Sequence, residues 1–350
     1  MASPLQRAQQ DGTPLIDGQA ATFVFQGIEP PVLRGDFNGW DPVQAPEWQA
    51  DGKDAWTTQL SLAEDAYIEY TFGTDDARVV DPFNPRRVSN GMGKYNNYFY
   101  MPKGGPTPFA AYRRAAPHGT VTRFDVPTHM LVAGRQRRVV LYQPPVDRPA
   151  PLVLVYDGPD YYRRASLTTV VDNLIAAGHI QPIALVMVAN GRDARTSEYG
   201  SSEGSMVWLQ EVVLPLAREH LSLVDVDEAP GAFGVLGASM GGLMSLYTAL
   251  RLPGTFGRVL SQSGAFHIGS YVTGVVDLVQ HLPVPPLRIW MDVGRYEWLL
   301  QSNREMHALL RSRGYDVTYN EYNAGHAYVA WRDDLVQGLQ ALFPPKVSSQ

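Results

Sequence analysis

The 350-residue sequence contains no cysteine. This absence excludes disulfide bonds, a cysteine nucleophile and metal sites built from thiolates. It is compatible with a reducing compartment.

The sequence also lacks an excess of basic residues and any long apolar run. It has 29 Lys and Arg against 35 Asp and Glu, with a net charge of −6. A nucleic-acid-binding domain is typically basic, and anionic membrane surfaces attract basic segments. No apolar stretch approaches the ~20 residues that a membrane helix needs, and residues 1–7 lack the features of a secretory signal. We therefore expect no nucleic-acid partner, no membrane association and a cytoplasmic location; the chain could form a homo-oligomer.

Two parts of the chain differ in their hydrophobic patterns. Before about residue 112, short β-branched and aromatic runs such as 22–27 and 67–72 are separated by turn clusters, which predicts a small all-β sandwich. A segment rich in proline and glycine, 102–108, follows as a linker. From about residue 120, two β-rich runs lead into apolar strands that alternate with helices. The expected strands are 152–156, 183–189, 233–236, 258–261, 287–293 and 317–322, and the expected helices lie near 166–177, 206–221, 240–250, 299–313 and 328–342.

This alternation predicts an α/β fold with a mainly parallel sheet that is covered on both faces. We place a β-sandwich domain at residues 1–112 and an α/β domain at residues 113–350.

A glycine-flanked serine is the most informative motif. Gly237-Ala238-Ser239-Met240-Gly241 follows a short buried strand and precedes an amphipathic helix. In that context G-x-S-x-G forms a nucleophile elbow, which exposes a serine hydroxyl at the edge of a sheet above a helix N-terminus. The alternative is a glycine-rich turn that merely contains a serine. We interpret Ser239 as a nucleophile.

A serine nucleophile needs a base, and the base needs an orienting acid. In α/β-hydrolases these residues follow the serine in the order acid, then histidine. His326 lies in a glycine-containing loop after the last expected strand and is the predicted base. The strand before that one is followed by Glu297, which we prefer as the acid over Asp292, a residue expected within the strand itself.

The oxyanion of the reaction would need two backbone N–H donors. The N–H of Met240, the residue after the nucleophile, is one. The other is expected from the loop after strand 152–156, where Pro159 has no N–H and either Gly158 or Asp160 would have to donate.

With these residues assigned, residues 120–345 resemble the esterase branch of the α/β-hydrolases, which includes enterochelin, feruloyl and acetyl-xylan esterases. The resemblance rests on the Asp157-Gly158 turn, the serine motif, Gly294-Arg295-Tyr296-Glu297, and Gly325-His326 followed by Trp331-Arg332. The last two are most similar to enterochelin esterases. In that family the matching positions are nucleophile Ser239, acid Glu297 and base His326.

The first half resembles the early-set, glycogen-binding type of sandwich that precedes such esterases. The matching segment is Leu33-Arg34-Gly35-Asp36-Phe37-Asn38-Gly39-Trp40. This resemblance implies a domain that binds glycan or covers the rim of the active site. Trp40 and Trp56 could stack on a sugar, although a core role is the more common one for tryptophan.

The resemblance also suggests where the substrate binds. Substrate contacts are expected from Arg195, Tyr161 and Trp331, although Arg195 lies in a segment that could equally form a local Arg–Glu ion pair. Siderophore esterases act on strongly anionic substrates and should have a basic pocket. Arg163, Arg164 and Arg195 are the candidates for it.

The predicted function is therefore that of a serine carboxylic-ester hydrolase that forms an acyl-enzyme on Ser239 and acts on a small-molecule ester. No metal or organic cofactor is implied. One alternative is an acyltransferase or peptidase with the same triad. Another is a glycan-binding protein whose hydrolase half is inactive, which an intact set of serine, acid and histidine argues against.

Overall fold

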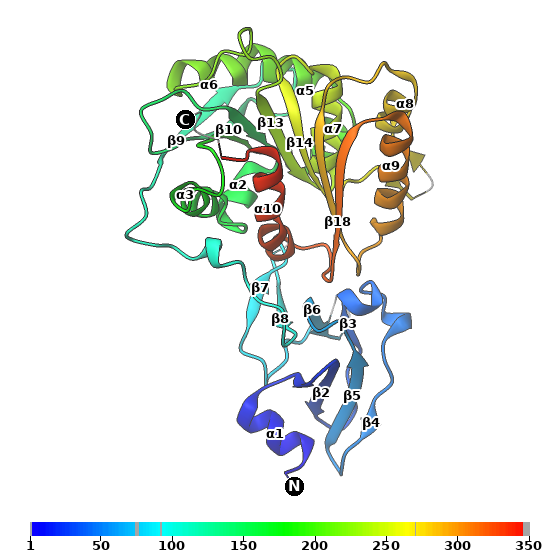
Figure 1. The fold of residues 1–350 in the computed structure, drawn as a ribbon. Coiled ribbons are helices and arrows are strands. Elements are labelled where there is room, and N and C mark those ends of the chain that lie inside the picture. Colours follow the sequence, from blue (N-terminus) through cyan, green and yellow to red (C-terminus); the bar gives the residue numbers. More distant parts are fainter. Residues whose placement is uncertain (1, 74–76, 92, 270, 346–350) are drawn as a thin grey trace. The chain divides into compact units, whose positions relative to one another are not determined.

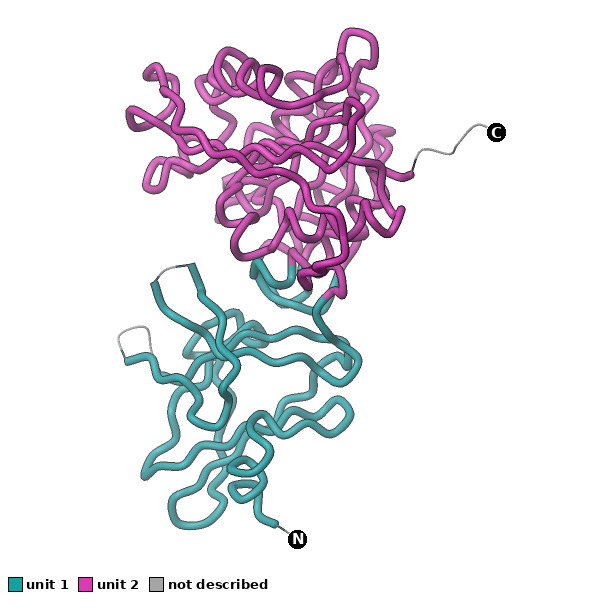
Figure 2. Tube along the Cα trace, turned by 90° about the vertical axis from the view of Figure 1, so that its left-hand side faces the viewer, with its two compact units in different colours: residues 1–106, 294–298, 322–330 teal, residues 107–293, 299–321, 331–350 magenta. Residues whose placement is uncertain are grey.

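The computed structural model describes residues 2–73, 77–91, 93–269 and 271–345. The chain forms two compact units, which Figure 2 shows in different colours. Unit 1 comprises residues 1–106, 294–298 and 322–330, and unit 2 comprises residues 107–293, 299–321 and 331–350. Two short segments from late in the sequence therefore belong to the same unit as the N-terminal residues.

Unit 1 contains two antiparallel sheets. The first has the strand order β1 (Leu15–Asp17), β2 (Ala20–Gln26), β5 (Ala55–Ser61) and β4 (Gln49–Ala50). The second has the order β3 (Leu33–Gly35), β6 (Tyr67–Phe72), β8 (Tyr95–Tyr100) and β7 (Arg87–Ser89). The helix α1 (Pro4–Asp11) and the 3-10 turns η1 (Asp36–Asn38) and η2 (Pro42–Gln44) complete this part of the chain.

The two sheets share one aromatic core. Phe23 of β2 packs edge-on against Tyr70 of β6, with ring centroids 4.9 Å apart, and against Phe99 of β8 at 5.8 Å. All three side chains are buried. Such tilted aromatic pairs stabilise a core beyond the burial of their area. Unit 1 is thus a β-sandwich, as the short aromatic runs predicted.

Unit 2 is built on an eight-stranded sheet with the order β18-β17-β14-β13-β11-β12-β10-β9. The strands β11, β12, β13, β14 and β17 pair in parallel, whereas β10 pairs antiparallel with β12 and β9. Their bounds are β9 Thr120–Pro127, β10 Gln136–Gln143, β11 Leu152–Val155, β12 Ala184–Val188, β13 Phe233–Ala238, β14 Phe256–Gln262, β17 Arg288–Gly294 and β18 Asp316–Tyr322. A short hairpin joins β15 (His267–Ile268) to β16 (Tyr271–Val272).

Helices cover both faces of this sheet (Figure 1). Their bounds are α2 Gly158–Arg163, α3 Leu167–Ala176, α4 Arg195–Tyr199, α5 Glu203–Trp208, α6 Leu214–His220, α7 Met240–Arg251, α8 Gly274–His281, α9 Leu300–Arg313 and α10 Tyr328–Leu342. The shorter turns are η3 (Pro108–Ala110), η4 (Arg192–Ala194) and the π-helical η5 (Leu209–Val213).

Two successive residues of β14 show how the two faces of the sheet are covered. Val259 packs into the core that α5 to α9 form with the sheet. The next residue, Leu260, lies against Gly338 of α10, where an added Cβ would come within 2.7 Å of it. Both side chains are buried, which explains why the strand is apolar at successive positions rather than at every second one.

The predicted fold class is confirmed: a small β-sandwich precedes an α/β-hydrolase fold with a mainly parallel sheet. The helix expected near 206–221 is instead divided into α5, the π-helical turn η5 and α6. Pro215 lies at the start of α6, and its missing N–H prevents a regular helix from passing through that point. The domain boundary at residue 112 stays a prediction.

Candidate active site

Ser239 occupies the turn between β13 and α7. Its backbone has φ 60° and ψ −124°, a conformation that residues with a side chain rarely adopt. The turn requires glycine, because a Cβ on Gly237 would overlap the backbone of Gly241. The N–H of Ser239 donates to the carbonyl of Gln262 at 2.9 Å, and the residue remains partly exposed. This is the geometry of a nucleophile elbow.

Two helices begin beside this turn. Because β11 and β13 are parallel neighbours, the turns that follow them lie at the same edge of the sheet. Met240 is the first residue of α7 and Gly158 the first of α2, and N–H groups at such positions have no acceptor within their own helix. The N–H of Asp160 already donates to the carbonyl of Asp157 at 2.9 Å. Of the two second donors considered from the sequence, Gly158 therefore has the better placement.

Asp157 holds the turn before α2 in place. Its carboxylate is almost fully buried and accepts hydrogen bonds from Arg195 Nη2 at 2.6 Å, Arg195 Nε at 2.9 Å and Asn190 Nδ2 at 2.5 Å. The Arg195 guanidinium also contacts the carbonyl of Ala238, the residue before Ser239, at 3.4 Å. Bidentate arginine–carboxylate pairs fix geometry as well as charge. Arg195 therefore joins the two turns that carry Gly158 and Ser239.

The local ion pair considered for Arg195 does not involve Glu198. Glu198 is buried and pairs with Arg137, whose two terminal nitrogens each lie 2.8 Å from it. The partner of Arg195 is Asp157 instead. The sequence suggested a local Arg–Glu pair, whereas the partners of Arg195 and Glu198 are distant in sequence: Asp157 follows β11 and Arg137 lies on β10.

His326 and Glu297 form a close pair in unit 1. Nδ1 of His326 lies 2.5 Å from Oε2 of Glu297, and the other carboxylate oxygen accepts the N–H of Gly294 at 2.7 Å. The side chain of Glu297 has no exposed surface and that of His326 is 16% exposed. A carboxylate on Nδ1 fixes the tautomer of the imidazole and stabilises its protonated form. The exposed ring of Trp298 lies against the imidazole.

Backbone hydrogen bonds join the loop of Glu297 to the loop of His326. The N–H of Arg295 donates to the carbonyl of Tyr322 at 2.8 Å, and the N–H of Tyr296 donates to the carbonyl of Ala324 at 3.1 Å. The two loops follow β17 and β18, which are neighbours in the sheet. Glu297 and His326 are thus held close together by main-chain hydrogen bonds between the residues that precede each of them.

Asp292, the alternative acid, makes its hydrogen bonds with other residues. It lies within β17, fully buried, and accepts from Trp290 Nε1 at 3.0 Å and from Gln262 Nε2 at 3.1 Å. Burial, and then the charge of Asp334, raise the pKa of Asp292 well above its ordinary value. The carboxylate that contacts the imidazole is that of Glu297.

Two of the expected substrate contacts are inside the core. Tyr161 is completely buried and its hydroxyl donates to Gln262 at 2.9 Å. Trp331 is 4% exposed and its indole N–H donates to Ser263 at 3.0 Å. Both side chains are buried, so the proposed site does not use them. The two aromatic residues considered for sugar stacking are partly buried, and each indole N–H donates within unit 1, from Trp40 to Asp36 and from Trp56 to Gly27.

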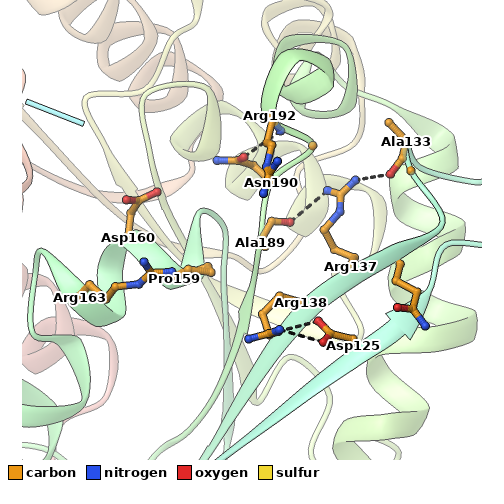
Figure 3. A pocket seen from close by; sticks show the side chains of 13 residues that line it. Asp125, Ala133, Arg137, Arg138, Pro159, Asp160, Arg163, Ala189, Asn190 and Arg192 are labelled. Carbon is orange, nitrogen blue, oxygen red and sulfur yellow. Dashed lines mark hydrogen bonds and ion pairs between the residues drawn. The ribbon is translucent and has the colours of Figure 1, made fainter. Parts of the chain in front are cut away.

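A cavity of about 610 Å³ lies beside the Gly158 turn in unit 2 (Figure 3). Its charged lining residues are Arg137, Arg138, Arg163, Arg192, Asp125 and Asp160. Arg137 is paired with Glu198, and Arg138 binds Asp125 through two hydrogen bonds of 2.6 and 2.8 Å. Arg163 and Arg192 add positive charge to this wall. Of the three arginines expected in a basic pocket, only Arg163 lines the cavity.

The other arginines of this cavity were not among the residues predicted from the sequence. Arg137 and Arg138 lie on β10, and Arg192 follows β12, the strand that pairs with β10. The only sequence feature that pointed to them was the basic cluster around Arg137. On a strand, such a cluster does not indicate which face of the sheet carries the charged side chains.

The structure brings the predicted residues together in two groups. Ser239, Met240 and Gly158 lie in unit 2, and Glu297 and His326 lie in unit 1. Within the described ranges, no three His, Asp or Glu side chains gather as they would around a metal ion. Among the helices that the structure describes, none is both long enough and apolar enough to cross a membrane.

The fold of unit 2 and its strained serine turn define an α/β-hydrolase with a nucleophile elbow. A model of the esterase family described as "Putative esterase" matches residues 131–342. The chain belongs to this family.

Known relatives of the chain include enterobactin esterases. The iron(III) enterobactin esterase of Dickeya dadantii is 31% identical over 229 residues, which are 59% of this chain and 52% of that protein. An iron(III) enterobactin esterase of Escherichia coli strain CFT073 is 24% identical over 277 residues, 76% of this chain and 68% of that protein. The chain thus spans about half the length of the first of these relatives.

Solved structures of similar fold include two enterobactin esterases. That of Salmonella typhimurium has a TM-score of 0.78 at 22% identity, with 92% of this chain and 93% of that chain covered. FES from Shigella flexneri, crystallised in the presence of enterobactin, has a TM-score of 0.76 at 21% identity and 94% coverage of both chains. At these identities the likeness supports the fold.

Proposed function

We propose that this protein is a serine carboxylic-ester hydrolase in which Ser239, His326 and Glu297 act as nucleophile, base and acid. The observation that carries the proposal is the backbone of Ser239 at φ 60° and ψ −124°, which an ordinary strand-to-helix turn has no reason to maintain. The close contact of Glu297 with His326 supports it, as does the order of the three residues along the chain.

In the proposed reaction, the Ser239 hydroxyl transfers its proton to Nε2 of His326 as its oxygen attacks the ester carbonyl. The buried carboxylate of Glu297 stabilises the imidazolium that forms. The N–H groups of Met240 and Gly158 donate to the oxyanion, aided by the N-terminus of α7. His326 then returns the proton to the departing alcohol, and water releases the acyl group by the same route.

We further propose an anionic aromatic ester as the substrate. Two observations support this choice. The relatives are named for iron(III) enterobactin, and a structure of the Shigella protein was determined with 2,3-di-hydroxy-N-benzoyl-serine. The cavity next to the Gly158 turn carries Arg163 and Arg192 on its wall, which suits a negatively charged group.

Without cysteine, the chain has no need of an oxidising compartment, in keeping with the expected cytoplasmic location.

The test of the chemistry is covalent labelling of the purified protein with a fluorophosphonate. The wild type should be labelled on one residue and Ser239→Ala should not, and the same substitution should abolish hydrolysis of p-nitrophenyl acetate. Labelling of Ser239→Ala to the wild-type extent would refute the nucleophile. A protein that is labelled on Ser239 but transfers its acyl group to added alcohols or amines faster than to water would be an acyltransferase.

The substrate class is tested separately. Arg163→Ala and Arg192→Ala should each raise KM for enterobactin and leave KM for neutral p-nitrophenyl acetate unchanged. Equal effects on both esters would remove the cavity from the substrate site. Retention of residues 1–112 on a polysaccharide column would instead support the glycan-binding role considered for the N-terminal part.

A further inference from the structure

We infer that Asp36, a residue of the N-terminal β-sandwich, is a positioning residue for the proposed base His326 and acts through Gly325. The inference rests on the proposed function, because it concerns the base of that reaction. All the residues involved belong to unit 1.

The carboxylate of Asp36 is held rigidly. Asp36 opens the turn η1 directly after β3 and is 4% exposed. One carboxylate oxygen accepts the backbone N–H of Glu69 at 2.7 Å, and the other accepts the indole N–H of Trp40 at 3.0 Å. A buried carboxylate with a donor on each oxygen has little freedom to move.

This carboxylate lies against the backbone of Gly325. A Cβ added to Gly325 would overlap it, and the three nearest heavy atoms to that Cβ all belong to Asp36. Gly325 does not have a positive φ, so a larger residue would fit its backbone conformation. The close approach of Asp36 is therefore what requires glycine here. Since His326 is the next residue, the position of the Asp36 carboxylate determines where the imidazole is attached.

Asp36 is also in electrostatic contact with the acid of the pair. Burial raises the pKa of Asp36 well above its ordinary value, and the negative charges of Glu69 and Glu297 raise it further. Glu69 is itself fixed by the hydroxyl of Tyr67 at 2.9 Å and by Nδ2 of Asn96 at 2.7 Å. The sandwich therefore supplies an ordered group of polar side chains next to Glu297.

This arrangement gives a second role to the segment Leu33 to Trp40, which resembles a glycogen-binding type of domain. The indole of Trp40 is hydrogen-bonded to Asp36, and the Arg78 guanidinium lies 5.6 Å above its ring. In this chain the segment supports the loop of the base, and the sandwich becomes part of the hydrolytic apparatus.

The test is a double-substitution cycle at positions 36 and 325. The turnover of p-nitrophenyl acetate is divided by the number of sites that a fluorophosphonate titrates, so that unfolded protein does not enter the value. Gly325→Ala should lower this kcat about tenfold or more with KM unchanged, because the new Cβ displaces the His326 loop. In the Asp36→Ala background the same substitution should cost less than twofold, because the space has been vacated.

Asp36→Ala alone should also lower kcat per titrated site, and Asp36→Asn, which keeps the side chain's shape, should retain more of it. The matched controls are Gly105→Ala, where an added Cβ meets nothing within 4 Å, and Asp17→Ala at an exposed carboxylate. Both should match the wild type.

Three results would overturn the inference while leaving the proposed function intact. The first is a Gly325→Ala variant with the kcat per titrated site of the wild type. The second is a Gly325→Ala substitution that lowers kcat equally whether residue 36 is Asp or Ala. The third is a Gly325→Ala variant that has fewer titratable sites but an unchanged kcat at each of them. Hydrolysis that survives Ser239→Ala would instead refute the proposed function, and the inference with it.

Discussion

The indole of Trp298 lies against the imidazole of His326, with ring centroids 4.7 Å apart and ring planes tilted by 40°. Trp298 is 68% exposed, which is unusual for so large an apolar side chain. A substrate group that approaches the proposed base from this side would meet the indole first. Aromatic pairs of this kind contribute about 0.5–1.5 kcal/mol beyond burial.

Trp298→Ala should therefore raise KM for esters with an aromatic acyl group by about 2- to 12-fold, the range that this contact energy corresponds to. KM for p-nitrophenyl acetate, with its small acyl group, should change less. Trp298→Phe should restore most of the aromatic preference. Steady-state kinetics on feruloyl and acetyl esters will measure this, and a uniform change for all esters would show that Trp298 only supports the imidazole.

Glu297→Gln should lower kcat by about a hundred- to ten-thousand-fold, because an amide cannot stabilise the imidazolium and favours the wrong tautomer. The amide oxygen can still accept the N–H of Gly294, so the loop should remain folded. Asp292→Asn is the comparison, since Asp292 contacts Trp290 and Gln262 rather than the base. If the two variants lose equal kcat per titrated site, the assignment of the acid is wrong.

Arg195→Lys separates the two roles considered for this arginine. A lysine cannot make the bidentate contact with Asp157, so the turn that carries Gly158 should loosen and kcat should fall about tenfold for neutral and anionic esters alike. A residue that binds the substrate's negative charge would behave differently. If Arg195 binds the substrate's negative charge, the substitution would raise KM for enterobactin alone. That outcome would show that Arg195 is part of the substrate site.

The buried carboxyl pair of Asp292 and Asp334 should make folding pH-dependent. Burial raises the pKa of Asp334 to about 6, from an ordinary value near 3.8, and raises that of Asp292 as well. The folded state therefore binds more protons than the unfolded state between about pH 4 and pH 6, so the free energy of unfolding falls as pH rises through this window.

Asp334→Asn removes one of these charges and leaves an amide that can donate to Asp292. The variant should be more stable than the wild type at pH 8, by up to about 3 kcal/mol, and should match it near pH 4. Urea denaturation from pH 4 to pH 8 measures the difference, with Asp147→Asn, at an exposed carboxylate, as the control. A constant difference across the range would show that the pair does not titrate on folding.

The features that could be predicted from the sequence are those that depend on neighbouring residues. The turn at Ser239 could be predicted from its own glycines, from the apolar strand before it and from the helix after it. The loops of Glu297 and His326 could be placed because each follows a strand of the same sheet. Arg195 was identified, but its partner Asp157 was not, because the two residues are 38 positions apart in the sequence.

Side-chain direction was the main thing that could not be predicted. Tyr161 and Trp331 are amphipathic aromatic residues near the predicted site, and a sequence pattern cannot distinguish a ring that faces a cleft from one that faces the core. The contact of Asp36 with Gly325 depends on two segments folding together from opposite ends of the chain. A contact of this kind cannot be predicted from the hydrophobic periodicity of either segment.

Unit 1 is made of three separate stretches of the chain, the last of which is residues 322–330. During synthesis on the ribosome, the first 106 residues emerge long before the loops of Glu297 and His326 exist. The contact of Asp36 with Gly325 can therefore form only after residue 325 has been synthesised. A chain truncated before residue 322 would therefore lack both His326, the proposed base, and the segment of unit 1 that packs against Asp36.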